Sequence, residues 1–309
     1  MSNPTFSVII PAYNAATTLR STVESAQKQT IKNIQIIIVD DGSTDQTTQI
    51  MLELASEDPR IRAISQSNSG VSAARNFGAK MARGRLLAFL DADDQWQPDK
   101  LVYHLAIHEA DELIDASFAK VAFCPEKNGE IVDGRSVSAT PYGYIDLSDV
   151  LIENATCTTS NLVIDAVAFA EIGGFDESLR YAEDQELLVR LIEQGRLIRG
   201  ISACLVKYRM SEDGLSCDFE AMLHNWRSFA AEWLGSEELA KAEAIYCRYL
   251  TRRALRSGAE ISVARSLVRR GLRSDKQTFL SGGKRSLLTL SGAIAGGAMP
   301  AAMRRSVFA

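Results

Sequence analysis

The feature that most constrains the fold is a regular alternation of apolar runs and helical segments near the start of the chain. Short, largely apolar runs occupy residues 6–10, 34–39 and 86–90, and a further strand is predicted at residues 61–65. Such runs are typical of strands that are covered on both faces of a sheet. The segments between them have helical character and the loops are short, so the order predicts an α/β sheet with mostly parallel strands.

A short loop segment follows each of these predicted strands, and three of the four segments are polar or acidic. The four segments are Pro11–Asn14, Asp40–Ser43, Gln66–Gly70 and Asp91–Asp94. In open α/β sheets ligands bind at the carboxyl ends of the strands, so we expect these segments to meet at one edge. Acidic residues at two of these loops are not needed for a sheet, and the sequence therefore predicts a ligand site there.

The acidic segment after the fourth strand has the chemistry of a metal site. Asp91 and Asp93 are two residues apart, so in extended backbone they would point the same way, and Asp94 follows directly. Neighbouring carboxylates repel each other unless a cation compensates. Mg²⁺ or Mn²⁺ commonly uses one or two carboxylates together with substrate phosphates. An acidic turn that merely ends a strand is the alternative.

Nucleotide binding is expected to differ from the two commonest glycine-rich modes. The first strand is followed by PAYNAA where a dinucleotide fold would carry GxGxxG, and no GxxxxGK[ST] of a P-loop occurs. Asp41 could accept a hydrogen bond from a base or a ribose, Tyr13 could stack on a base, and Arg75 could bind base or phosphate. A half-buried loop aromatic and a solvated helix face are the alternatives for Tyr13 and Arg75.

A second group of carboxylates is predicted at the start of a later helix. The apolar spacing that ends with Ile192 indicates a helix, and it places Glu183 and Asp184 in the first turn. The helix dipole keeps carboxylates at this end ionised, and an ionised carboxylate at a cleft could act as a general base. Simple capping of the helix is the alternative. Residues 158–164 and 205–209 are predicted strands on either side of this helix.

The 309-residue chain is longer than one minimal domain, and we expect two parts. Residues 1–216 would form the α/β domain, and residues 217–309 a basic helical region whose tail, from about residue 286, is flexible or membrane-peripheral. From Arg248 onward the charge is about +11, against about −16 for the rest. The basic part could bind anionic membrane or dock on the acidic part. No base-reading motif accompanies it, so nucleic acid is not an expected partner.

The cysteines and the start of the chain bear on localisation. The five cysteines are scattered without a CxxC pair, and an apolar strand begins at once, without a basic leader. Both features predict a reducing cytosol, in which the protein would be cytoplasmic or peripheral on the inner face of the cell membrane.

Taken together, these segments resemble the family 2 glycosyltransferases. The resemblance covers about residues 4–210 and rests on separated motifs in the family's order: FSVIIPAYNAATTLRSTVESAQKQT, IIIVDDGSTDQT, NSGVSAARNFGAKMARGRLLAFLDADDQWQPDKL and GGFDESLRYAEDQELLVRL. It implies the GT-A fold, a Rossmann-like mixed sheet flanked by helices, here with a helical C-terminal appendage. The chain is similar in particular to bacterial exopolysaccharide glycosyltransferases that extend lipid-linked oligosaccharides.

The resemblance also implies an activity and roles for individual residues. The expected reaction is inverting transfer of a sugar from a nucleotide donor, most often UDP-linked, to a glycan hydroxyl, with Mn²⁺ or Mg²⁺. Asp184 would be the catalytic base. Asp93 would be the direct metal ligand, with Asp91 nearer the ribose or donor sugar and Asp94 as a helper. The other implied contacts are Pro11, Ala12, Tyr13, Asp41 and Arg75 with the donor nucleoside, Arg209 with the leaving diphosphate, and Trp96, Gly174, Phe175, Asp176 and Glu183 with the donor or acceptor.

One position departs from the family pattern, and two other classes stay open. Family members often have a metal-binding His two residues after the Arg of a YRxHxxS-like segment, where this chain has Ser211. Metal binding could be weaker, or Glu212 or Asp213 could substitute. A haloacid-dehalogenase-like phosphohydrolase also has a strand that ends in DxD, although there Asp94 would replace the usual Thr or Val. A non-catalytic sugar-nucleotide binder is the third class.

Overall fold

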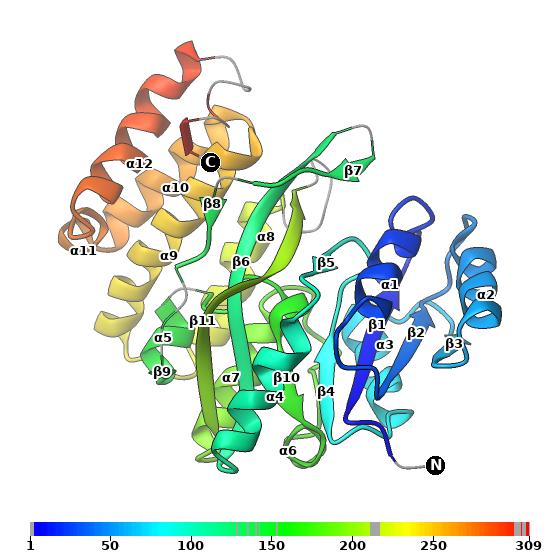
Figure 1. Cartoon of the computed structure of the whole chain (residues 1–309). Coiled ribbons are helices and arrows are strands. Elements are labelled where there is room, and N and C mark those ends of the chain that lie inside the picture. The colour runs from blue at the N-terminus through cyan, green and yellow to red at the C-terminus, as the bar shows by residue number, and fades with distance from the viewer. Residues whose placement is uncertain are drawn as a thin grey trace. The chain divides into compact units, whose positions relative to one another are not determined.

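Figure 1 shows a computed structural model of the chain, which describes residues 3–127, 129–134, 136–139, 141, 143–152, 154–210, 217–299, 304 and 307–308. The chain divides into two compact units. Unit 1 comprises residues 1–147 and 155–209, and unit 2 comprises residues 148–154 and 210–309. Ser211, Glu212 and Asp213 lie outside the described residues. The predicted domain boundary after residue 216, at the end of the same undescribed stretch, stays a prediction.

Unit 1 is built on one mixed sheet with the strand order β3-β2-β1-β4-β10-β6-β11-β5. The first four of these strands are parallel, as the sequence predicted: β1 (Phe6–Ala12), β2 (Ile34–Asp40), β3 (Ile61–Ser65) and β4 (Leu86–Phe89). An antiparallel part extends the sheet beyond β4: β10 (Val163–Asp165), β6 (Ile114–Lys127), β11 (Leu197–Met210) and β5 (Gln95–Trp96). Short strands pair with β6 and β11: β7 (Glu130–Ile131), β8 (Ser136–Val137) and β9 (Gly143–Tyr144).

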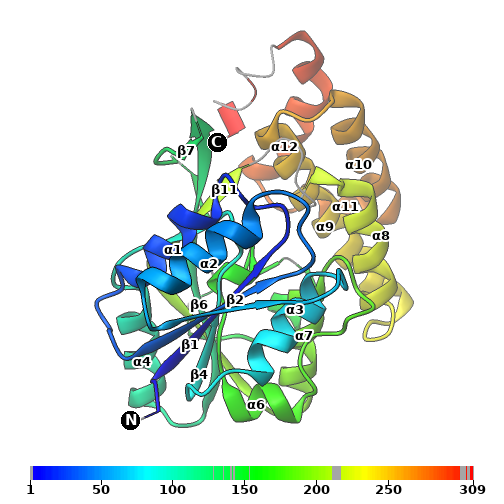
Figure 2. The same cartoon turned by 90° about the vertical axis from the view of Figure 1, so that its right-hand side faces the viewer.

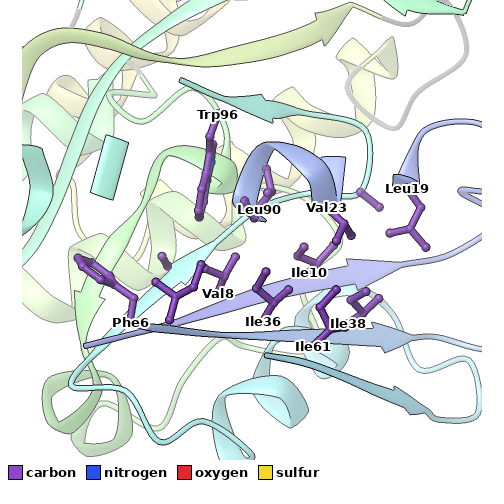
Figure 3. Packing of buried hydrophobic residues seen from close by; sticks show 14 of the residues in the cluster. Phe6, Val8, Ile10, Leu19, Val23, Ile36, Ile38, Ile61, Leu90 and Trp96 are labelled. Atoms are coloured by element: carbon purple, nitrogen blue, oxygen red, sulfur yellow. The ribbon is translucent and has the colours of Figure 1, made fainter. Parts of the chain in front are cut away.

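Helices cover both faces of the parallel part. The core on one face joins Val8, Ile10 and Ile36 of the strands to Leu19 and Val23 (Figure 3). On the other face Ile37 and Val39 pack with Ala74. The helices of unit 1 are α1 (Leu19–Gln27) and α2 (Thr47–Glu57) on the first face, α3 (Val71–Lys80) on the second, then α4 (Lys100–Ala110), α6 (Ala166–Glu171) and α7 (Glu183–Glu193) (Figure 2). Strands buried on both faces explain why the sequence shows continuous apolar runs.

Three predicted strand boundaries are wrong. The strand predicted at residues 205–209 is only the end of β11, which begins at Leu197. The first strand continues through Pro11 to Ala12. By alternation along the strand, the missing N–H of Pro11 faces β4, which has already ended at Phe89, so no ladder bond is lost. The segment predicted as a strand from Thr158 instead forms a short 3₁₀ helix, Thr159–Asn161, before β10. Its hydroxyl and amide side chains form hydrogen bonds within the turn and to residues distant in sequence, and these bonds compete with strand pairing.

Unit 2 is helical, which confirms the predicted C-terminal helical region. Its helices are α5 (Leu147–Ile152, which begins at the last residue of the first unit 1 segment), α8 (Phe219–Ala230), α9 (Ser236–Ser257), α10 (Ile261–Ser274), α11 (Lys276–Leu280) and α12 (Lys284–Ala295). Trp226 stacks on Tyr246 with ring centroids 4.4 Å apart. Glu243 is buried and pairs with Arg227 and Arg270. Among the described residues no helix combines the length and apolar character needed to cross a membrane.

Candidate active site at the carboxyl edge of the sheet

The loops after β1 and β2 are joined by hydrogen bonds. Asn14 has a left-handed backbone, with φ of 49°, and its N–H donates to the Ser43 hydroxyl over 2.9 Å. Its side-chain oxygen accepts from the Thr44 N–H, also over 2.9 Å. Asn14 and Ser43 therefore cross-link the two loops, and the helices that follow have Thr18 and Gln46 at their N-cap positions.

Asp41 holds the loop after β3 at the same edge. One carboxylate oxygen accepts from Gln66 Nε2 over 2.7 Å and from the Ser69 N–H over 2.9 Å. The other oxygen accepts from the Gly70 N–H over 2.9 Å. Asp41 is only 4% exposed, so any nucleoside contact would add to a carboxylate that already orders this loop. Of the other residues assigned to the nucleoside, Pro11 and Ala12 are buried in β1, and Tyr13 is exposed at its end.

Arg75 lies buried at the centre of the site, which excludes the solvated helix face. Its contact with a base or phosphate of the donor stays a prediction. Its guanidinium donates to Asp91 Oδ1 over 2.6 Å and to Glu183 Oε1 over 2.9 Å. Phe175 lies beneath it, with its ring centroid 5.3 Å away. Burial disfavours its charge, but Asp91 and Glu183 together raise the pKa of Arg75. Arg75 thus joins the two acidic motifs, which are about ninety residues apart in the chain.

The three aspartates after β4 have different surroundings. Asp91 accepts from Arg75 and, over 3.1 Å, from the Thr158 hydroxyl. Asp94 is fully buried, and one of its oxygens accepts from the Arg209 N–H over 2.9 Å. Burial and the neighbouring carboxylates raise the pKa of Asp94 well above its usual value. Asp93 is half-buried; burial and the charge of Asp91 raise its pKa to about 6.

The surroundings of the three aspartates after β4 show whether these residues fit the predicted metal ion. Among the residues that the structure describes, no group of three or more His, Cys, Asp and Glu side chains is arranged to hold an ion. The raised pKa of Asp93 reflects burial first and the charge of Asp91 second, and a divalent cation would stabilise the ionised form of both carboxylates. Asp93 and Asp91 supply hard oxygen atoms, and Mg²⁺ or Mn²⁺ takes most other ligands from water and phosphate. The residues therefore fit an ion that arrives with a diphosphate, with Asp93 less engaged by protein groups than Asp91.

The predicted base lies at the start of α7, as expected. Asp184 is 6% exposed, and its two oxygens accept from the Thr156 hydroxyl over 3.0 Å and from the Gln185 N–H over 2.9 Å. Ala182, just before the helix, is left-handed with φ of 61°. The raised pKa of Glu183 reflects burial first, with the charge of Asp184 adding to it and Arg75 opposing it. Glu183 thus pairs with Arg75, and Asp184 is held by a hydroxyl.

Sequence reasoning missed the segment 156–161, TCTTSN, which serves both acidic motifs. Thr156 donates to Asp184, Thr158 donates to Asp91, and the Ser160 hydroxyl accepts from the Asp91 N–H over 2.9 Å. Cys157 between them is left-handed, with φ of 65°. Left-handed residues other than glycine carry strain that tends to collect at functional sites, and here all three described ones flank the site. The only sequence signal was the concentration of hydroxyl and amide side chains.

The remaining predicted site residues are mostly structural. Trp96 is 4% exposed in the core, and its Nε1–H donates to the Ser160 carbonyl over 2.8 Å. Phe175 is buried against Phe89, and Gly174 has φ of 75° beside the side chain of Asn76. This burial does not favour the expected acceptor contacts, which stay predictions. Asp176 is exposed, and its bonds to Ser178 lower its pKa.

Arg209 lies at the end of β11 against the aspartate turn. Its Nε–H donates to the Asp93 carbonyl over 2.9 Å, and its Nη1 pairs with Glu126 over 2.8 Å. The residue is 3% exposed. Arg209 therefore fixes the backbone of the acidic turn, and its predicted contact with a leaving diphosphate would require Glu126 to share the guanidinium.

Comparisons with known proteins agree with this geometry. A family model described as Glycosyl transferase family 2 matches residues 7–173. An uncharacterized glycosyltransferase of Rickettsia typhi is 30% identical over 245 residues, which cover 79% of this chain and 75% of the relative. One from Rickettsia felis is 30% identical over 256 residues, which cover 81% of this chain but only 42% of the relative.

Two solved structures share the fold. Staphylococcus aureus TarS (residues 1–349) in complex with UDP-GlcNAc has a TM-score of 0.55 at 19% identity, over 98% of this chain and 88% of that one. The mannosyltransferase PcManGT from Pyrobaculum calidifontis, in complex with GDP-Man and Mn²⁺, has a TM-score of 0.61 at 15% identity, over 100% and 85%. At these identities the likeness shows the fold.

Proposed function

The chain belongs to glycosyl transferase family 2, and from this premise we propose that it is an inverting, metal-dependent enzyme that transfers a sugar from a UDP-linked donor to a glycan hydroxyl. The observation that carries the proposal is the convergence of two acidic motifs. Arg75 binds both Asp91 of the DxD turn and Glu183, which directly precedes Asp184. A donor-binding turn and a candidate base thus belong to one site, as transfer between two substrates requires.

The roles of the two motifs follow from their environments. The donor diphosphate would lie at Asp93, and a divalent cation bound there would offset the charge that develops on the departing nucleoside diphosphate. Asp184 would take the proton of the acceptor hydroxyl as that oxygen attacks the anomeric carbon from the face opposite the diphosphate. One such displacement inverts the configuration. The hydrogen bond from Thr156 keeps the Asp184 carboxylate in one orientation for this transfer.

The nature of the donor is supported by the structural neighbours. The TarS and PcManGT structures hold UDP-GlcNAc and GDP-Man respectively, and the latter also holds Mn²⁺. The acceptor in our proposal is a glycan, lipid-linked, in the synthesis of an exopolysaccharide or another surface polysaccharide. Pasteurella multocida chondroitin synthase, 28% identical over 193 residues, is a polysaccharide-forming relative of which this chain covers 19%.

The experiment that tests the proposal is a donor screen on the full chain. UDP-glucose, UDP-galactose, UDP-GlcNAc and GDP-mannose are each added with Mn²⁺, and both the melting temperature and the release of nucleoside diphosphate are measured. We expect at least one UDP-sugar to raise the melting temperature by several degrees and to release UDP. Binding without any release of nucleoside diphosphate, with simple glycan acceptors present, would favour a non-catalytic binder. Hydrolysis of p-nitrophenyl phosphate would favour a phosphohydrolase instead.

A further inference from the structure

Behind the site, a fully buried lysine contacts the segment that carries the site hydroxyls. Lys100, the first residue of α4, has no exposed surface. Its side-chain nitrogen Nζ donates to the Asn161 carbonyl over 3.3 Å, lies 3.0 Å from His104 Nε2, and sits 4.7 Å from the ring centroid of Trp96. No carboxylate of the described residues lies within ion-pair distance of it. Burial lowers the pKa of Lys100 well below its usual value, because an ammonium group without a carboxylate partner is costly to bury.

Asn161 connects this lysine to the strand beside it. Its side-chain oxygen accepts from the Ala119 N–H over 2.9 Å, and its amide nitrogen donates to the Ala119 carbonyl on β6. The same amide nitrogen donates to the Thr156 carbonyl over 3.0 Å. Asn161 is itself fully buried. Its side chain therefore ties the turn at residues 156–161 to the sheet, while Lys100 ties the backbone of that turn to α4.

Three hydrogen bonds, joined through the covalent bonds of Asn161 and Thr156, thus connect Lys100 to the predicted base. They run from Lys100 Nζ to the Asn161 carbonyl, from Asn161 Nδ2 to the Thr156 carbonyl, and from the Thr156 hydroxyl to Asp184 Oδ2 over 3.0 Å. Cys157 has a left-handed backbone at the turn that these bonds must hold. A strained backbone turn persists only where several contacts hold it in place. The contacts of Lys100, Asn161 and Thr156 hold this turn.

We propose that Lys100 and Asn161 are positioning residues of the transfer reaction, which act through Thr156 to fix the carboxylate of Asp184. The proposal rests on the function proposed above, because it takes Asp184 to be the base. A displacement of a reacting group by about 1 Å can lower a rate about 100-fold. Loss of this support is therefore expected to slow the proton transfer while it leaves the nucleoside and diphosphate contacts in place.

The test is a double-mutant cycle on the full chain, with turnover measured as UDP release from the best donor of the screen. Thr156→Val removes the hydroxyl and keeps the shape, and we expect kcat to fall about 10- to 100-fold. The affinity for UDP with Mn²⁺, measured by calorimetry, should stay within about twofold of the wild type. Thr156→Ser restores a hydroxyl and should restore kcat to within a few-fold of the wild type.

The second arm separates positioning from general destabilisation. Lys100→Met should lower kcat in the wild-type background, but it should cost little more in the Thr156→Val background, because the Thr156 hydroxyl through which Lys100 acts is already absent. Independent, multiplicative losses would overturn the proposal, and so would a Thr156→Val variant with wild-type kcat. If Lys100→Met does not fold, Asn161→Asp, which removes the Nδ2–H donor to the Thr156 carbonyl, takes its place in the cycle, with the active fraction counted by UDP binding and the same two outcomes deciding.

A parallel measurement of Asp184→Asn distinguishes failure of this inference from failure of the function. If Asp184→Asn abolishes UDP release and Thr156→Val does not change it, the positioning chain is wrong and the proposed base stands. If Asp184→Asn retains wild-type release, the base assignment is wrong and the positioning role is overturned with it.

Discussion

At the scale of single residues, the site depends on one arginine between two carboxylates. Arg75 is almost completely buried and pairs with both Asp91 and Glu183. Buried ion pairs add little net stability compared with apolar residues, but removal of one partner leaves the others charged and without compensation. The side chain that sequence reasoning assigned to a nucleoside or to solvent therefore determines whether both acidic motifs can stay ionised inside the protein.

Replacement of Arg75 by methionine should be strongly destabilising. We expect the Arg75→Met substitution to lower the free energy of unfolding by about 3 kcal/mol, because Asp91 and Glu183 lose their common cation. The matched control is Arg20→Met, which breaks an exposed contact to Glu53 and Glu57 and should cost less than about 1 kcal/mol. Urea unfolding measures both values. Equal losses in the two variants would show that the Arg75 bridge is not a structural requirement.

At the scale of elements, α4 packs on β6 through a buried polar chain. His104 Nδ1 lies 2.7 Å and His108 Nε2 lies 2.9 Å from the hydroxyl of Ser117 on the strand. Burial lowers the pKa of His108 to about 4, helped by Arg85 and opposed by Asp165 and Asp115. Burial, with Lys100 and His108, lowers the pKa of His104 well below its usual value. Both rings are therefore neutral in the folded protein at neutral pH.

This burial predicts a loss of stability in mild acid. Between pH 6.5 and about 4 the unfolded chain binds a proton at residue 108 and the folded protein does not, so the free energy of unfolding falls as the pH falls. The shift corresponds to at most about 3 kcal/mol. Urea unfolding of the wild type and of His108→Gln at pH 7 and at pH 4.5 isolates this contribution from carboxylates that titrate nearby. A pH dependence identical in the two proteins would contradict the assignment.

The elements also show what the sequence could and could not predict. Apolar runs identify β1, β2 and β4 because these strands are covered on both faces, whereas β3 is partly exposed. The strand ends predict a site at the edge where the structure brings Arg75 and Asp91 together. The position of Arg75 was not predictable, since its partners Asp91 and Glu183 meet only through the fold. Residues 158–161 were mistaken for the start of a strand because the structure of the turn at residues 156–161 comes from contacts with Ala119 and Asp184, which are distant in sequence.

At the scale of the whole molecule, the chain consists of two units of opposite charge. Residues 276–309 contain five Lys or Arg and no Asp or Glu. Within them, α12 exposes Leu287, Leu288 and Ile294, each more than half accessible, and begins with the exposed Lys284 and Arg285. A basic helix with exposed apolar side chains is suited to the surface of an anionic membrane. We propose that α12 docks on a membrane surface and so gives the enzyme access to the lipid-linked acceptor of the proposed function.

The membrane proposal predicts a defined defect. Wild-type protein should pellet with vesicles of phosphatidylglycerol and phosphatidylcholine. The double variant Leu287→Ser and Leu288→Ser should bind at least about tenfold more weakly, because it loses two leucine side chains that would be buried in the membrane. The control, Leu52→Ser with Leu113→Ser, removes equally exposed leucines of unit 1 and should bind like the wild type. Equal pelleting of all three proteins would exclude α12 as the docking element.

The most direct test of the account compares Asp184→Asn with Asp93→Ala in one pair of assays. UDP release from the best donor is measured together with the calorimetric affinity for UDP in the presence of Mn²⁺. For Asp184→Asn we predict that release falls at least about 1,000-fold, because the base is lost, while the UDP affinity stays within about threefold. For Asp93→Ala we predict that both fall. A loss of UDP affinity in Asp184→Asn as large as that in Asp93→Ala would contradict the assignment of Asp184 as the base.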